Sequence, residues 1–189
     1  DGTLIHTETS LSLSTSTGND LYVGGGEGNA FDGRLFKGYI DELGMWDREL
    51  VSTEVVELYN TGSGTEYNDG FGGSGGDGLV EGEKGDALWD NVTGYYRFNG
   101  DYEDRSENSG DIEIIGTNEI ETTEQWAGTG ALKLANAYTY RNGIKLEGDT
   151  INFGSDDFCI EFMFKIDEDF TLTNGVDYFL MDFREVIPS

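Results

Sequence analysis

The sequence predicts an all-β protein, an antiparallel β-sandwich with one short helix. Residues 158–166 alternate between apolar and other side chains over nine positions, so their large apolar residues fall on one face, as in a half-buried strand. The chain holds 29 glycines against one proline, and the glycines separate short segments of this kind. Only residues 52–60 place apolar side chains at helical spacing. Many short strands beside one short helix are typical of a sandwich, not of a parallel α/β sheet.

Residues 52–60 carry the signals of a helix. Ser52 can cap the first turn, and Glu54 complements the positive end of the helix dipole. Val55, Leu58 and Tyr59 form an apolar stripe. Further strands are expected at residues 3–7, 21–24, 37–45, 94–99, 131–135 and 144–146.

The charge of the chain restricts its partners. It carries 38 acidic and 11 basic residues, for a formal net charge of -27. Such a surface repels phosphate backbones and anionic lipids, so we expect no nucleic-acid binding and no membrane docking. No apolar run approaches the roughly 20 residues needed to cross a bilayer, so no membrane insertion is expected either. The acidic surface suits calcium, cationic partners or simple solubility.

The residues that most often carry chemistry are few. Cys159 is the only cysteine, which excludes an internal disulfide, and its place in the alternating strand predicts a buried, unreactive thiol. His6 is the only histidine, so the sequence supports neither a catalytic triad nor a zinc site. Residues 24–28 are rich in glycine but lack the lysine and the following helix of a phosphate-binding loop.

Residues 21–25 and 36–46, followed by the predicted helix, resemble the closing strands of laminin G-like domains, which belong to the concanavalin A-like lectin and glucanase superfamily. The resemblance rests on a glycine, an Ile-Asp-Glu strand that begins at Ile40, an aromatic residue, Leu50 and the short helix. It covers nearly all of residues 1–62, and it implies a jelly-roll sandwich.

The second part of the chain resembles the opening of the same kind of domain. Residues 94–101 are similar to its first strand, and residues 130–134 are similar to the next. Residues 157–165 match a strand in which the family usually has a tryptophan, where this chain has Met163 and Phe164.

The order of these two resemblances is unusual, because the closing half comes first. We expect the chain to be cut from a longer tandem array. Residues 1–62 then end one laminin G-like sandwich, residues 63–85 form a Gly-rich linker, and residues 86–189 begin the next sandwich. The alternative is a compact permuted sandwich, in which the strands of the two parts share one core.

Catalysis is not expected. Enzymes of this superfamily cleave β-glucans with a Glu-x-Asp-x-x-Glu strand motif, whose paired carboxylates share a face. Asp111 and Glu113 begin in a similar way, but no second glutamate follows at the required spacing. We therefore predict that the chain is not an enzyme.

A structural calcium ion is the one cofactor that the resemblance implies. In concanavalin A-like domains it often bridges the opening and closing strands, and the aspartate of the Ile-Asp-Glu strand often contributes. That residue is Asp41 here, and Asp101, Asp104 and Asn108 are the candidates in the opening half. The alternative is a solvated acidic edge.

The closing strand contains one irregularity. Ile40, Leu43 and Met45 are spaced by three and then by two, which breaks the period of a regular strand. This spacing predicts a bulge near Asp41 and Glu42 that could turn their carboxylates outward.

Three functions remain open. The first is a non-catalytic binding or adhesion module of an extracellular, cell-surface or virion protein, which recognises a glycan or a protein surface and contacts neighbouring copies or further domains of the same chain. The second is a purely structural or decoration sandwich in a phage-like assembly, and the third is an accessory domain of a glycoside hydrolase. Glycan binding would use aromatic faces, and Trp46 is expected to pack on the closing helix instead. The available aromatic residues are Trp46, Trp89, Trp126, Tyr138 and Tyr140.

Overall fold

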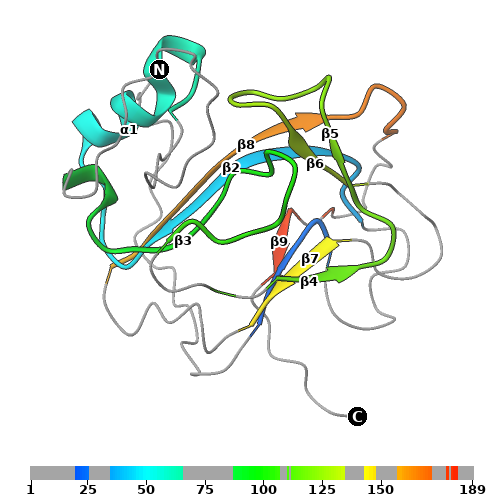
Figure 1. The fold of residues 1–189 in the computed structure, drawn as a ribbon, viewed down its shortest axis with the longest axis horizontal. Helices are drawn as coiled ribbons and strands as arrows, with labels where there is room; N and C mark the ends of the chain where they lie inside the picture. Colours follow the sequence, from blue (N-terminus) through cyan, green and yellow to red (C-terminus); the bar gives the residue numbers. More distant parts are fainter. Residues whose placement is uncertain are drawn as a thin grey trace.

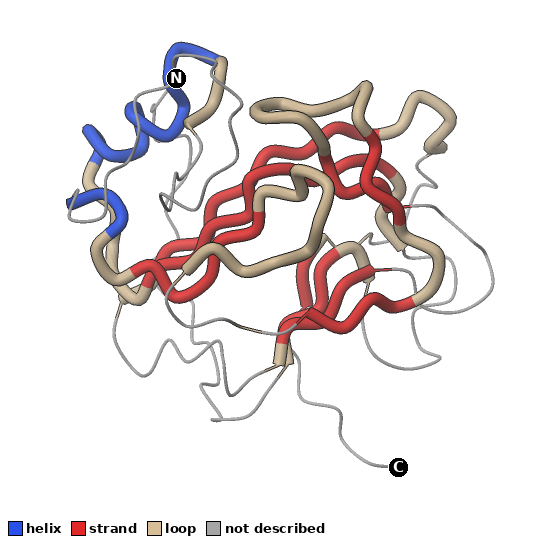
Figure 2. Tube along the Cα trace, in the orientation of Figure 1, coloured by secondary structure: helices blue, strands red, loops and turns tan. Residues whose placement is uncertain are grey.

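The computed structural model describes residues 20–25, 35–65, 87–106, 110, 112–134, 143–147, 157–171, 178 and 180–182. These residues form two antiparallel β-sheets and one α-helix (Figure 1). The strands gather in two layers (Figure 2), and apolar side chains fill the space between them. The predicted all-β antiparallel sandwich with one short helix is confirmed. The jelly-roll connectivity that the resemblance implies stays a prediction.

The smaller sheet has four strands in the order β4-β7-β1-β9. These strands are β1 (Leu21–Val23), β4 (Ile112–Ile115), β7 (Gly143–Leu146) and β9 (Met181–Asp182). β1 pairs with β7 on one side and with β9 on the other. The sheet therefore joins segments that lie far apart in the sequence.

The larger sheet is built around β2 (Gly38–Trp46). β3 (Val92–Tyr96) and β6 (Ala131–Leu134) pair with successive stretches of β2, and β5 (Glu119–Glu121) pairs with β6. β8 (Cys159–Ile166) pairs along nearly the whole length of β2. It therefore lies on the opposite side of β2 from β3 and β6, and the two long strands run side by side in Figure 1.

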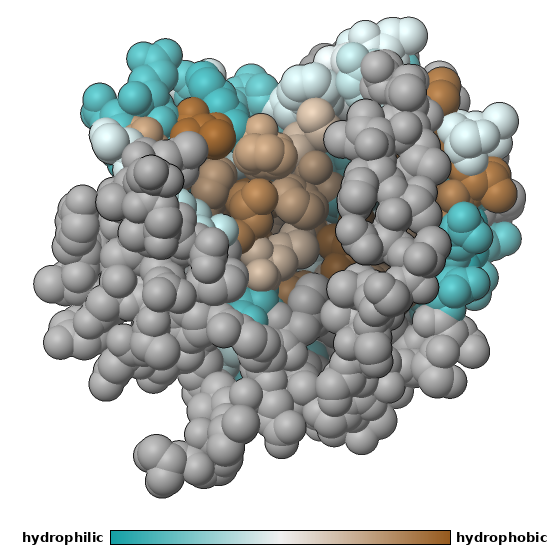
Figure 3. Space-filling view, turned by 180° about the vertical axis from the view of Figure 1, so that it is seen from behind, coloured by the Kyte–Doolittle hydropathy of each residue, from teal (hydrophilic) through white to brown (hydrophobic). Residues whose placement is uncertain are grey.

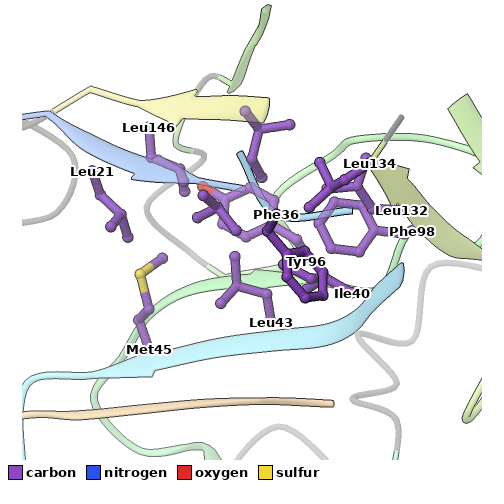
Figure 4. Packing of buried hydrophobic residues seen from close by; sticks show 12 residues of the cluster. Leu21, Phe36, Ile40, Leu43, Met45, Tyr96, Phe98, Leu132, Leu134 and Leu146 are labelled. Carbon is purple, nitrogen blue, oxygen red and sulfur yellow. The ribbon is translucent and has the colours of Figure 1, made fainter. Parts of the chain in front are cut away.

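Apolar residues from both sheets meet in the main core (Figure 4). β2 contributes Ile40, Leu43 and Met45, which are fully buried, and the smaller sheet contributes Leu21 and Leu146. Burying a side chain of this kind stabilises a fold by roughly 1.5–3 kcal/mol. The apolar spacing of β2 therefore decides which of its faces turns inward.

The two parts of the chain on either side of the predicted linker share this core. β2 precedes the linker, yet it pairs with β3, β6 and β8, which follow it. Phe162 packs against the cluster that contains Ile40 and Leu43. Phe164 contacts Phe36 of the same cluster edge to face, with ring centroids 6.2 Å apart. The expectation of separate cores is wrong for the described residues, because each part supplies strand partners to the other.

The predicted domain boundaries are not tested by this packing. Most of the predicted linker lies outside the described residues, as does the predicted strand at residues 3–7. The first linker residues are packed, because Thr65 is buried and its hydroxyl donates a hydrogen bond of 2.7 Å to the Glu57 carbonyl.

The predicted helix is α1 (Ser52–Tyr59), but its N-cap differs from the expectation. Val51 is the N-cap and Ser52 is already helical, so the prediction that Ser52 caps the helix is wrong. Glu54 accepts the Val51 backbone N–H at 2.8 Å, and Arg48 holds the same carboxylate with two hydrogen bonds of 2.8 Å. The helix start is therefore fixed by an ion pair. Neither α1 nor any other helix in the described part of the chain is long and apolar enough to cross a membrane.

A second apolar cluster covers the face of the larger sheet that points away from the main core, here called the outer face. Its members come from β2, β3, α1, the residue Leu50 before the helix and the 3-10 turn Ala87–Trp89 before β3. The 3-10 turn Asn60–Gly62 that follows α1 contributes no buried residue. The Trp46 ring is fully buried, and its Nε1 donates a hydrogen bond of 2.9 Å to the Leu88 carbonyl. The expectation that Trp46 packs on the closing helix is confirmed. The cluster comprises Trp46, Leu50, Leu58, Leu88, Trp89 and Tyr95.

Candidate functional site

β2 contains the bulge that its apolar spacing predicts. Asp41 lies opposite Met163 and Gly44 lies opposite Glu161, so three steps along β2 match two steps along β8. Glu42 accommodates the extra residue with a φ of 52°, in the left-handed region. The bulge places Asp41 and Glu42 on the outer face of the sheet, where both are buried, each 3% exposed.

Asp41 anchors the loop between β5 and β6. Its Oδ2 accepts hydrogen bonds from the backbone N–H groups of Trp126 at 2.7 Å and Ala127 at 3.1 Å. Its Oδ1 accepts the N–H of Glu42 at 3.0 Å. Hydrogen bonds to a carboxylate are stronger than those between neutral groups. Asp41 therefore ties the loop that carries Trp126 to the bulge of β2.

Glu42 connects the bulge to β3. The Tyr95 hydroxyl donates a hydrogen bond to the Glu42 carboxylate, and the same hydroxyl lies 3.2 Å from the Thr65 carbonyl. Tyr95 is almost fully buried at 1% exposure. The strands β2 and β3 thus bring polar side chains together on the outer face.

Glu161 is the third carboxyl group of this region. It lies opposite Gly44, on the same face of β8 as Met163. Burial, and to a lesser extent the nearby Asp41 carboxylate, together raise the pKa of the Glu161 carboxyl from 4.5 to about 7. Near neutral pH, both the protonated and the ionised form of Glu161 are therefore populated.

An open pocket lies beside these carboxyl groups, between β2, β8 and the loop that Asp41 anchors. It encloses about 350 Å³, including the part that is open to solvent. Trp126 is 38% exposed, so its ring can meet a bound molecule, whereas the Phe164 ring turns to the opposite face of β8, where it contacts Phe36. The pocket is lined by Tyr39, Asp41, Glu124, Gln125, Trp126, Met163, Phe164 and Lys165.

Polar groups frame the aromatic rings of the pocket. The Lys165 ammonium donates a hydrogen bond to the Glu124 carboxylate and lies 5.9 Å from the centre of the Tyr39 ring. Glu124 raises the pKa of Lys165, so the ammonium stays charged. Exposed ion pairs of this kind contribute little to stability, so the ion pair can open and either partner can bind a ligand instead.

Figure 3 shows another feature of the surface. Apolar side chains gather at the centre of the face seen in that view.

The aromatic candidates for glycan stacking differ in their exposure to solvent. Trp46 and Trp89 are buried in the outer cluster, with exposures of 0% and 6%. Tyr138 and Tyr140 lie outside the described residues. Trp126 therefore is the candidate that reaches the surface in the described part of the chain.

Asp104 and Asp101 hold the chain that follows β3. Asp104 Oδ1 accepts the backbone N–H groups of Tyr95 at 2.9 Å and Ser106 at 2.8 Å. Its Oδ2 accepts the Ser106 hydroxyl at 2.9 Å and the Gly110 N–H at 2.8 Å. Asp101 forms an ion pair of 2.6 Å with Arg105.

These contacts do not fit a calcium site. N–H and O–H donors already point at both carboxylate oxygens of Asp41 and of Asp104, where a calcium ion would have to lie. Asn108 lies outside the described residues. Within the described ranges, no three His, Cys, Asp or Glu side chains are grouped to hold a metal ion. We therefore assign Asp41 and Asp104 as anchors of neighbouring loops.

Two other residues singled out by the sequence take structural places. Cys159 is partly buried, and burial together with Glu161 raises the pKa of its thiol to about 11, as expected for an unreactive cysteine. Glu113 is 62% exposed on β4 and lies 3.5 Å from Lys145 of β7. Asp111 and His6 lie outside the described residues.

Most of the pocket residues could not be identified from the sequence. Tyr39, Glu124, Gln125 and Lys165 were not singled out as binding residues. The available signal was the alternation of β8, which places Met163 and Lys165 on the face away from the core. This alternation points to the pocket only in combination with the pairing of β8 with β2, which brings Met163 and Lys165 next to Tyr39 and Asp41.

Comparison with known proteins identifies no relative. No protein-family model matches the chain, and no curated protein or solved structure matches it. The resemblance to laminin G-like domains therefore stays a prediction from the motifs.

Proposed function

We propose that this chain is a non-catalytic binding module of an extracellular, cell-surface or virion protein, and that it recognises a glycan in the pocket on the outer face. The observation that carries the proposal is the exposed ring of Trp126 at the pocket, whose backbone is held by Asp41. The resemblance to laminin G-like domains supports the same class of function.

The chemistry of the pocket suits a sugar. One face of a pyranose ring presents C–H groups that pack on an aromatic ring, and its hydroxyls need hydrogen-bond partners. Trp126 offers the ring, and the Gln125 amide, the Glu124 carboxylate and the Lys165 ammonium offer donors and acceptors around it. A neutral sugar is favoured, because the net charge of -27 repels sulfated or uronic acid chains.

The carboxyl groups beside the pocket support binding without catalysis. Glycoside hydrolysis needs two carboxyl groups free to act as acid and as base or nucleophile on either side of the bond that is cleaved. Asp41 is held by three backbone N–H groups, and Glu124 is paired with Lys165. Asp41 therefore has a structural role, and Glu124 is charge-paired with Lys165 and is not placed as a free acid or base.

A glycan array that contains neutral and anionic oligosaccharides tests the proposal directly. Wild-type protein should bind a neutral glycan, and Trp126→Ala should weaken that binding by about tenfold or more, as expected for a central aromatic contact. Ile114→Ala is the matched control, because Ile114 is 44% exposed on β4 of the other sheet. Equal binding by wild type and Trp126→Ala, or binding to protein partners alone, would overturn the assignment.

A further inference from the structure

We propose that protonation of Glu161 controls the pocket, because it sets how firmly Asp41 holds the loop that carries Trp126. Protonated Glu161 leaves Asp41 as a stable anchor, whereas ionised Glu161 weakens the anchor and loosens the loop. The effect on ligand binding rests on the proposed function, but the loop itself can be followed without any ligand.

The geometry links Glu161 to the pocket in two steps. Glu161 and Asp41 lie on the outer face of paired strands, diagonally across the bulge. Met163 is opposite Asp41, and Glu161, two residues from Met163 on the same face of β8, is opposite Gly44. Asp41 in turn binds the backbone N–H groups of Trp126 and Ala127 through a single oxygen. A change in charge at Glu161 therefore acts on the group that positions Trp126.

The charged groups around Glu161 leave Asp41 as its main electrostatic neighbour. On β8 itself, Cys159 stays protonated and Lys165 is bonded to Glu124 of the loop. On β2, Glu42 accepts the hydroxyl of Tyr95 from β3.

Of these groups, Asp41 is the one whose charge acts on the carboxyl of Glu161, in addition to burial. Ionisation of Glu161 would thus place two carboxylates side by side in a partly dehydrated region, and their repulsion is relieved most easily by moving Asp41.

Hydrogen exchange of the Trp126 and Ala127 amides measures the anchor without a ligand. The experiment follows wild-type protein in EDTA across pH 5.5 to 8.5 (roughly 1.5 units on either side of neutral), and each rate is corrected for intrinsic exchange. The protection of both amides should fall by about tenfold across this range, which corresponds to about 1.4 kcal/mol of coupling between the two carboxyl groups.

Glu161→Gln is the decisive variant, because glutamine keeps the shape of a protonated glutamate. Its Trp126 and Ala127 amides should keep the same protection at all pH values, while Glu113→Gln, an exposed glutamate on the other sheet, should behave as wild type. Carbon-13 NMR of the wild-type Glu161 carboxyl should show its titration in the same range. A pH-dependent loop that persists in Glu161→Gln, or a Glu161 that titrates near pH 4.5, would overturn the proposal.

Binding measurements then separate this inference from the proposed function. If a neutral glycan binds, its affinity should fall with pH for wild type and stay constant for Glu161→Gln. If no glycan binds but the amides respond as described, the control by Glu161 stands and the proposed function fails. If glycan binds and the amides do not respond, the function stands and the control by Glu161 fails.

Discussion

Glu161→Gln should stabilise the protein in alkaline solution and have little effect in acid. The wild-type carboxyl group lies on the outer face of β8, opposite Gly44 and close to Asp41. Burial and the Asp41 charge both disfavour its ionised form. Glutamine has nearly the same shape and carries no charge at any pH, so the substitution removes the titration while it preserves the packing.

The size of the effect follows from the pKa. Folding raises the pKa of Glu161 from 4.5 to about 7. At about 1.4 kcal/mol per pKa unit, this shift corresponds to about 3 kcal/mol. Because Glu161 keeps partial contact with water, we expect about 2 kcal/mol. The folded pKa is raised, so the contribution to stability is fully present below pH 4.5 and is lost as the pH rises through about 7.

Urea unfolding at pH 4 and at pH 8 measures this difference (roughly the two sides of the titration). Wild type and Glu161→Gln should have similar free energies of unfolding at the lower pH, and the variant should be about 2 kcal/mol more stable at the higher pH with an unchanged denaturant slope. Other acidic residues titrate equally in both proteins and cancel in the comparison. A variant that is no more stable than wild type at the higher pH would refute the assigned environment of Glu161.

Three further perturbations test the surroundings of the site. In Gly44→Ala, the new Cβ would lie 2.4 Å from the Trp46 ring, which is buried and hydrogen-bonded, so we expect a loss of about 2 kcal/mol and a melting temperature about 4–8 °C lower. Asp104→Ala leaves several donors unsatisfied and should lower the free energy of unfolding by about 3 kcal/mol, whereas Asp101→Ala, which removes a surface ion pair, should cost less than about 1 kcal/mol. Millimolar calcium and excess EDTA should give melting temperatures within about 1 °C, and a clear rise with calcium would contradict the assignment of Asp41 and Asp104 as loop anchors.

The regular parts of the fold could be predicted because they depend on local patterns. The alternation at residues 158–166 is strand β8, and the helical spacing after Ser52 is α1. Even the bulge followed from the spacing of Ile40, Leu43 and Met45, since the core accepts only residues on one face. These patterns state which face of an element is buried, and they need no knowledge of its neighbours.

The pairing of β2 with β8 could not be predicted in the same way. It joins segments more than a hundred residues apart, and many registers between two apolar strands satisfy the same alternation. The sequence therefore left open whether the two parts of the chain share a core. The cap of α1 was mispredicted for a related reason, because the ion pair between Arg48 and Glu54 outweighs the local preference for Ser52 at the cap.

The acidic residues near the pocket show why a strand pattern alone misjudges this site. Glu161 follows the alternation of β8 as a polar residue on the face away from the core, and such a residue is normally solvated. Here the cluster around Trp46 and Tyr95 packs on the same face, and the carboxyl group is largely removed from water. The bulge then brings Asp41 beside it, and backbone N–H groups of the Trp126 loop compensate the Asp41 charge. Part of the chain's acidity thus has a structural role, since the loop that shapes the pocket is held by a carboxylate whose neighbour titrates near neutral pH.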